Sequence, residues 1–266
     1  MQTNTIDVAN LVEAKSEAVQ AFMMHHVMNS PTWAWLPHLH TSLPFGLTVH
    51  SVMMLAVAIL LIVVLGTLAR RQQPVPTGLL NAVEFSAKYI RDEVVIPFLG
   101  EQDGRKMTPM FCSLFFFILV MNLAGLIPCF YTATSNLGVT AALASIILGF
   151  MIFGAIYKNG FVAFCKGFAP TGIPKPMLIM IVPIEFVSIF IRAMALAIRL
   201  FANMLAGHLV IYSLVGLMVM FGIYAAPALL GALGMYLLEV FVAFLQAYIF
   251  TLLSAIFIGE RYHPAH

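Results

Sequence analysis

The sequence predicts an all-α polytopic membrane protein with about five membrane helices and one surface helix. Apolar residues make up 62% of the 266 positions, charged residues only 9%, and the mean hydropathy is +0.99. A soluble globular protein carries about 25% charged residues, so this composition excludes that class. Several apolar runs also reach the roughly 20 residues that an α-helix needs to cross a bilayer. We therefore expect the chain to lie in a lipid bilayer.

Five apolar runs mark the expected spans. They cover about residues 47–69, 109–129, 137–157, 176–220 and 227–258. A more polar segment, residues 78–97, carries apolar residues at roughly helical spacing and is expected to form a helix at the membrane surface. Residues 1–46 remain as an N-terminal segment, and residues 259–266 as a C-terminal tail.

Basic residues set the expected orientation, because short cytoplasmic loops are enriched in Lys and Arg. They cluster between the first and second spans and again after the third span, whereas the connections 130–138 and 222–227 carry no charge. Residues 1–46 are then expected on the periplasmic or intermembrane side, and the tail on the cytoplasmic or matrix side. A net charge of +2 with this scatter gives no argument for nucleic acid.

The last two spans are longer than a bilayer requires. A helix over residues 176–220 would be about 65 Å long at 1.5 Å per residue, against a hydrocarbon thickness of roughly 30 Å. It must be steeply tilted or kinked at Pro183. We expect these two helices to form a hairpin.

A polar stripe runs along the fourth span and is centred on Arg199. At 100° per residue, Glu185, Ser188, Arg192 and Asn203 lie within about 40° of this arginine. Ala195, Ala202 and Ala206 share the face, and small residues allow a neighbouring helix to approach closely. A charged side chain at bilayer depth costs roughly 2.5–3.5 kcal/mol, so Arg199 is a candidate functional residue.

A second polar group is expected on the other side of the fourth span. His208 falls about 180° from Arg199, and Glu239 and Gln246 share one face of the last helix. In an antiparallel hairpin Glu239 would lie near His208. A carboxylate and an imidazole within hydrogen-bond reach can exchange a proton near neutral pH.

Structural interpretations of the same residues stay open. Glu185 could neutralise Arg192, Glu239 could form a buried structural ion pair with Arg199, and His208 could be a satisfied core histidine. The joint presence of ionisable groups within spans favours function.

The remaining histidines fit no metal-site spacing and are interpreted as interfacial: His25, His26, His38, His40 and His50. The three cysteines are interpreted as free thiols, and neither a metal nor a cofactor is expected.

Arginine limits the possible mechanism, because its guanidinium does not deprotonate in proteins. Arg199 can instead favour the ionised form of an acid about 4 Å away, by about 4 kcal/mol at an effective dielectric near 20. That acid must regain a proton before it enters lipid. Ionisable groups on both sides of the blocking arginine predict two separate half-channels.

The segment RLFANMLAGH (199–208) resembles subunit a of the F-type ATP synthase, together with IEFVSIFIRAMALAI (184–198) and EVFVAFLQAYIF (239–250). MNLAGLIP (121–128) is also typical, and the resemblance covers about residues 45–258. It implies that Arg199 is the essential stator arginine, facing the carboxylates of a rotating c-ring. Asn203, His208, Glu239 and Gln246 would line the periplasmic or intermembrane half-channel, and Glu185, Ser188 and Arg192 the cytoplasmic or matrix one.

Three positions vary among members of the family it resembles. Some bacterial members have Glu where this chain has His208 and His where it has Glu239, so this chain carries the exchanged pair. Some members have an acidic residue where this chain has Gly125, so any role of that acid is lost here.

The resemblance implies a stationary proton-conducting subunit that is not catalytic alone and works with a c-ring, the subunit b peripheral stalk and the rest of the synthase. The sequence has no GxxxxGK[ST] motif, so we expect no directly bound nucleotide. The alternatives are a proton-coupled secondary transporter, which would show an internal repeat, and a structural anchor. The N-terminus lacks signal and transit features, which favours a bacterial plasma membrane, with a mitochondrial inner membrane as the alternative.

Overall fold

The fold was obtained as a computed structural model, which describes residue 10 and residues 14–17, 49–70, 78–127, 132–168 and 175–263. Within these ranges the secondary structure is helical, with no strand. Five helices are long and apolar enough to cross a membrane: His50–Leu68, Leu79–Leu126, Leu137–Asn159, Pro176–Phe221 and Ala226–Tyr262. The predicted fold class, a polytopic all-α membrane protein, is confirmed.

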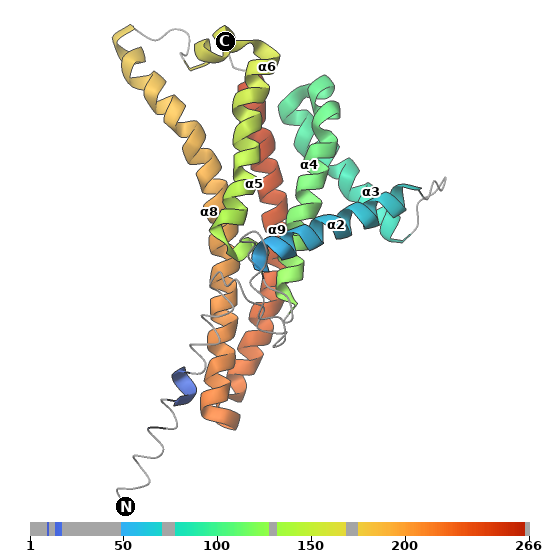
Figure 1. The fold of residues 1–266 in the computed structure, drawn as a ribbon, viewed down its shortest axis with the longest axis vertical. Coiled ribbons are helices and arrows are strands. Elements are labelled where there is room, and N and C mark those ends of the chain that lie inside the picture. The colour runs from blue at the N-terminus through green and yellow to red at the C-terminus, as the bar shows by residue number, and fades with distance from the viewer. Residues whose placement is uncertain are drawn as a thin grey trace, which may run out of the picture.

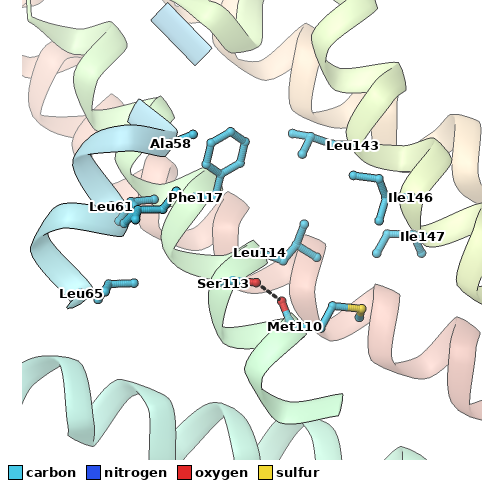
Figure 2. Close-up of a pocket in the computed structure, with 11 residues that line it drawn as sticks. Ala58, Leu61, Leu65, Met110, Ser113, Leu114, Phe117, Leu143, Ile146 and Ile147 are labelled. Atoms are coloured by element: carbon cyan, nitrogen blue, oxygen red, sulfur yellow. Dashed lines mark hydrogen bonds between the residues drawn. The ribbon is translucent and has the colours of Figure 1, made fainter. Parts of the chain in front are cut away.

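Helix α2 (Val49–Arg70) lies across the direction of α5, α8 and α9, as Figure 1 shows. Few of its residues are buried, and most of its apolar side chains face outward. It leaves a pocket of about 520 Å³ beside helices α4 and α5 (Figure 2). The lining is apolar apart from Ser113, whose hydroxyl donates to the Met110 carbonyl at 2.8 Å. This pocket carries no titratable group.

The expected surface helix and the second span form one helical segment. Helix α3 (Leu79–Tyr89) continues through a π-helical turn, η2 (Ile90–Val95), into α4 (Ile96–Leu126). The only non-helical residue inside α4 is Gly100, with φ 77° and ψ 170°. From the sequence, the surface helix was expected to end near residue 97 and the span to begin near residue 109. Gly100 lies between these positions, and its positive φ makes the change of direction there.

The third span is also one rod, built from α5 (Leu137–Gly149), a π-helical turn η4 (Phe150–Gly154) and α6 (Ala155–Asn159). Asn136 caps its start, since its side-chain oxygen accepts the Gly138 N–H at 2.8 Å. A short helix, α7 (Phe161–Lys166), follows Gly160, which has φ 82°. A 3₁₀ turn, η3 (Ala133–Ser135), precedes the rod.

Helices α8 (Lys175–Phe221) and α9 (Ala226–Tyr262) form the expected hairpin through η5 (Gly222–Ala225). In Figure 1 they run side by side near the turn, and the first part of α8 then diverges from the bundle. Helix α8 continues through Pro183. Helix α9 packs along both α4 and α8, which makes it the central helix of the bundle.

The C-terminal tail expected from residue 259 is instead part of α9. The helix continues to Tyr262, and Gly259, Arg261 and Tyr262 are buried. The Asn159 side-chain amide donates to the carbonyls of Arg261 and Tyr262 at 3.2 Å each, which satisfies acceptors that a helix end leaves free. The expectation was wrong because the apolar run ends before the helix does.

The glycine at 259 sets how closely α9 approaches the start of α4. A Cβ at this position would overlap the backbone carbonyl of Phe98, which cannot move aside as a flexible side chain can. Gly259→Ala should therefore lower the free energy of unfolding by about 1–3 kcal/mol, as overpacked positions do. The measurement is thermal or denaturant unfolding of the purified protein in detergent.

The matched control is Gly234→Ala on the same helix, where an added Cβ meets nothing within 4 Å. That variant should be neutral or slightly stabilising, because alanine loses less conformational entropy than glycine in a helix. Equal stabilities for the two variants would show that the close approach of α9 to α4 does not require glycine at position 259.

Candidate functional site

His208 on α8 and Glu239 on α9 meet inside the hairpin. The His208 Nδ1 and Glu239 Oε1 atoms lie 3.5 Å apart, and the two residues are only 9% and 6% exposed. Gly207 makes room for this contact, because a Cβ at that position would overlap the Glu239 carboxylate. The proximity predicted from an antiparallel hairpin is confirmed.

The His208 ring has oxygen atoms close to both of its nitrogens. Nδ1 lies 3.0 Å from the Met204 carbonyl, and Nε2 lies 3.0 Å from the Gly125 carbonyl and 2.9 Å from the Thr132 hydroxyl. Carbonyl oxygens accept hydrogen bonds, so each ring nitrogen has a partner when it carries a proton. The ring can thus hold protons on both nitrogens beside a carboxylate that can receive one.

Several buried polar atoms on α4 and α9 have no hydrogen-bond partner among the described residues. Among the described residues, neither carboxylate oxygen of Glu239 has a hydrogen-bond partner, and the same holds for Gln246 Nε2 and Asn122 Oδ1. Buried polar groups normally have partners, so each exception needs an explanation. The Glu239 carboxylate is thus a buried acid whose two oxygens remain able to accept hydrogen bonds.

Arg199 lies on the opposite, exposed face of α8. Ala195, Ala202 and Ala206 are exposed along the same face, and the structure gives Arg199 no ion-pair partner among the residues it describes. The open alternative of an ion pair between Arg199 and Glu239 is therefore wrong. The helix separates a free cation on its outer face from a buried acid and imidazole on its inner face.

The polar residues near the start of α8 pair with the end of α9. Glu185 forms an ion pair with Arg261, and Arg192 forms one with Glu260. The alternative in which Glu185 and Arg192 neutralise each other is not what the structure shows. Arg261 is also stacked over the Phe168 ring at 5.2 Å, and Ser188 donates its hydroxyl to the Glu185 carbonyl at 2.7 Å.

Three residues that contact the predicted ones were not predicted from the sequence: Thr132, Glu260 and Arg261. A fourth, His50, contacts Thr132. The two charged residues were assigned to a tail, although their position directly after an apolar helical run was a usable signal. His50 was interpreted as interfacial, but it is 1% exposed and donates from Nδ1 to the Thr132 carbonyl at 3.1 Å. The predictions for His25, His26, His38 and His40 lie outside the described residues.

Asn203 and Gln246 complete the residues expected beside His208 and Glu239. Asn203 is half-buried one turn after Arg199, and Gln246 is 5% exposed two turns after Glu239. In the described part of the chain, no group of three His, Cys, Asp or Glu side chains is arranged to hold a metal ion.

Comparison with known proteins gives a single family. The sequence profile described as "ATP synthase A chain" matches residues 51–259. Similar proteins include the ATP synthase subunit a of Anaeromyxobacter dehalogenans (strain 2CP-C), 40% identical over 91% of this chain and 70% of the relative. Those of Chloroherpeton thalassium and Rhodopseudomonas palustris (strain BisB5) are 42% and 38% identical, over 89% and 80% of this chain and 75% and 87% of the relatives.

The ion pair between Arg261 and Glu185 should contribute more to stability than an exposed pair. The side chains are 8% and 33% exposed, against 66% and 70% for Arg105 and Glu101. A double-mutant cycle with Arg261→Gln and Glu185→Gln should give a coupling energy of about 1–3 kcal/mol. The same cycle on the exposed pair should give about 0.2–1 kcal/mol. Equal values from unfolding in detergent would contradict this difference.

Proposed function

Because the chain belongs to the ATP synthase A chain family, we propose that it conducts protons through two offset half-channels to and from the carboxylates of a c-ring. The family places it as a membrane subunit of a rotary ATP synthase that acts in ion transport and ATP synthesis without being catalytic alone. This membership does not favour the alternative of a proton-coupled secondary transporter.

The exposed position of Arg199 carries this proposal. A guanidinium within an apolar span is costly in contact with lipid, so a partner surface should cover it. The exposed alanines on either side leave room for a close helix. A ring carboxylic acid that reaches Arg199 would ionise, and its proton would leave toward one half-channel. The same acid would have to take a proton from the other half-channel before it moves back into lipid.

The half-channel on the periplasmic side would be formed by His208, Glu239, Asn203 and Gln246. Support comes from the 3.5 Å distance between the imidazole and the carboxylate and from the oxygen acceptors at both ring nitrogens. An imidazole that holds two protons can release one to Glu239 and then take another. The proton would pass from this pair toward the outer face of α8.

The half-channel on the cytoplasmic side would contain Glu185, Ser188 and Arg192. Support comes from their half-buried position on α8, on the face that also carries Arg199. The ion pair with Arg261 would orient the Glu185 carboxylate at this opening. Arg192, which forms an ion pair with Glu260, would contribute to the electrostatic potential at the same opening.

The remaining partners and the membrane belong to the same proposal. The c-ring would cover the exposed stripe of α8, and the subunit b stalk would hold the chain stationary against rotation. The relatives come from bacteria, which supports a bacterial plasma membrane rather than a mitochondrial inner membrane. Orientation by basic loops would place the end of α9 on the cytoplasmic side.

Replacing Arg199 tests the proposal most directly. Arg199→Ala should abolish ATP synthesis driven by a proton gradient in vesicles, because no fixed charge would remain to discharge the ring carboxylate. Passive proton leak can rise in the same variant. Arg105→Ala, which removes an exposed arginine outside the stripe, is the control and should keep normal synthesis. Normal synthesis in Arg199→Ala would refute the proposed role.

Cysteine cross-linking tests the surface that would face the ring. Ala206→Cys should form a disulfide with a cysteine placed beside the ring carboxylate, since Ala206 lies within about 20° of Arg199. Met194→Cys is the control, because Met194 is 58% exposed but about 140° away around the helix. Cross-linking through Met194 and not Ala206 would place the ring on another face.

A further inference from the structure

The hydroxyl of Thr132 occupies a position between the proposed relay histidine and a backbone carbonyl. Its Oγ1 lies 2.9 Å from His208 Nε2 and 3.3 Å from the Gly125 carbonyl. Thr132 is only 5% exposed. Gly125 allows this arrangement, because a Cβ at that position would press against the Thr132 side chain.

A hydroxyl differs from a carbonyl in that it can both donate and accept a hydrogen bond. When His208 Nε2 lacks a proton, Thr132 can donate its O–H to the Nε2 lone pair. When Nε2 carries a proton, the ring donates to Oγ1, and the hydroxyl can turn to donate to the Gly125 carbonyl. No covalent bond breaks at the threonine. Only the direction of its hydrogen bond changes.

The other partner of Nε2 lacks this property. The Gly125 carbonyl can only accept, so it matches Nε2 in the protonated state alone. A buried lone pair that faces only another lone pair loses a hydrogen bond. Without the Thr132 hydroxyl, the surroundings would hold Nε2 in one protonation state.

We propose that Thr132 is a positioning residue that keeps His208 Nε2 hydrogen-bonded both when this nitrogen carries a proton and when it does not, and that His50 fixes Thr132 in place. This inference rests on the proposed function, because it assigns the threonine to the same proton path. It adds a residue from the loop before α5, and through His50 the start of α2, to a site otherwise built on α8 and α9.

The backbone of Thr132 is held from two directions. Its carbonyl accepts the His50 Nδ1–H at 3.1 Å and the Ser135 hydroxyl at 2.7 Å. The His50 ring comes from α2, a helix of which few residues are buried. These bonds fix the backbone of Thr132, and hence the direction in which Oγ1 can point.

Other groups around His208 could influence its protonation and belong in the test. Glu239 on α9 faces Nδ1, and Tyr212 on α8 packs edge-on against the ring, with centroids 5.8 Å apart. Tyr236 on α9 donates its hydroxyl to the Leu126 carbonyl near the same loop. Among the described contacts of Nε2, only the Thr132 hydroxyl can either donate or accept the hydrogen bond.

The experiment measures passive proton flux, as a function of pH, through vesicles that contain the assembled complex without its catalytic head. Thr132→Val keeps the shape and removes the hydroxyl, and it should lower the flux by about 2- to 12-fold, the factor expected for one lost hydrogen bond. The pH dependence of the flux should also change. Thr132→Ser keeps a hydroxyl and should restore both.

The matched control is Thr140→Val on α5, which is equally buried but whose hydroxyl donates only to the Leu137 carbonyl at 3.1 Å. It should keep the wild-type flux and pH dependence. His50→Ala should also lower the flux, as Thr132→Val does, since the Thr132 carbonyl loses its hydrogen bond to α2. A purely structural role would change the yield of complex and leave the pH dependence unaltered.

Glu239→Gln and Arg199→Ala separate this inference from the proposed function. Wild-type flux and pH dependence in Thr132→Val, with reduced flux in Glu239→Gln, would overturn the role of Thr132 alone. Wild-type behaviour in both Glu239→Gln and Arg199→Ala would overturn the proposed function. If Thr132→Val fails to assemble, the flux and its pH dependence are measured in Thr132→Ala instead, and the same outcomes support or overturn the inference. Assembly of only Thr132→Ser would mean that the hydroxyl is needed for folding, which would also overturn the inference.

Discussion

The close approach of α8 and α9 at Gly207 is the constraint on which the rest of the site depends. A side chain at that position would occupy the space of the Glu239 carboxylate. With glycine there, the carboxylate lies beside His208 in a region from which solvent is largely excluded. Electrostatic interactions are stronger in such a region than in water, so this acid and this imidazole strongly influence each other.

Arg199 and His208 project from opposite faces of α8, because nine residues at 100° each place them about 180° apart. The exposed side presents Arg199 among small residues, and the buried side presents His208 to Glu239 and to the loop before α5. An arginine retains its proton, whereas a histidine exchanges protons near neutral pH. One helix can thus offer a fixed charge to an outside partner and an exchangeable proton to the interior.

The far end of the site is fixed by contacts between residues distant in the sequence. Arg261 and Glu260 on the last turn of α9 pair with Glu185 and Arg192 on α8. Asn159 caps α9, and Gly259 lets that helix pack closely against the start of α4. The end of α9 therefore joins three parts of the bundle, and it positions the charges of the proposed cytoplasmic opening.

The sequence by itself determined the membrane class, the five spans, the long hairpin and the separation of Arg199 from His208. These follow from composition, from the lengths of apolar runs and from the angle of 100° per residue, all of which are local properties. Only the tertiary structure decided that α3 continues into α4 through η2 with a kink at Gly100, and that α9 continues to Tyr262. It also decided that Glu185 binds Arg261 and that His208 contacts Thr132, 76 residues away in each case. Such pairings depend on how helices pack against one another, which the pattern along a single helix does not specify.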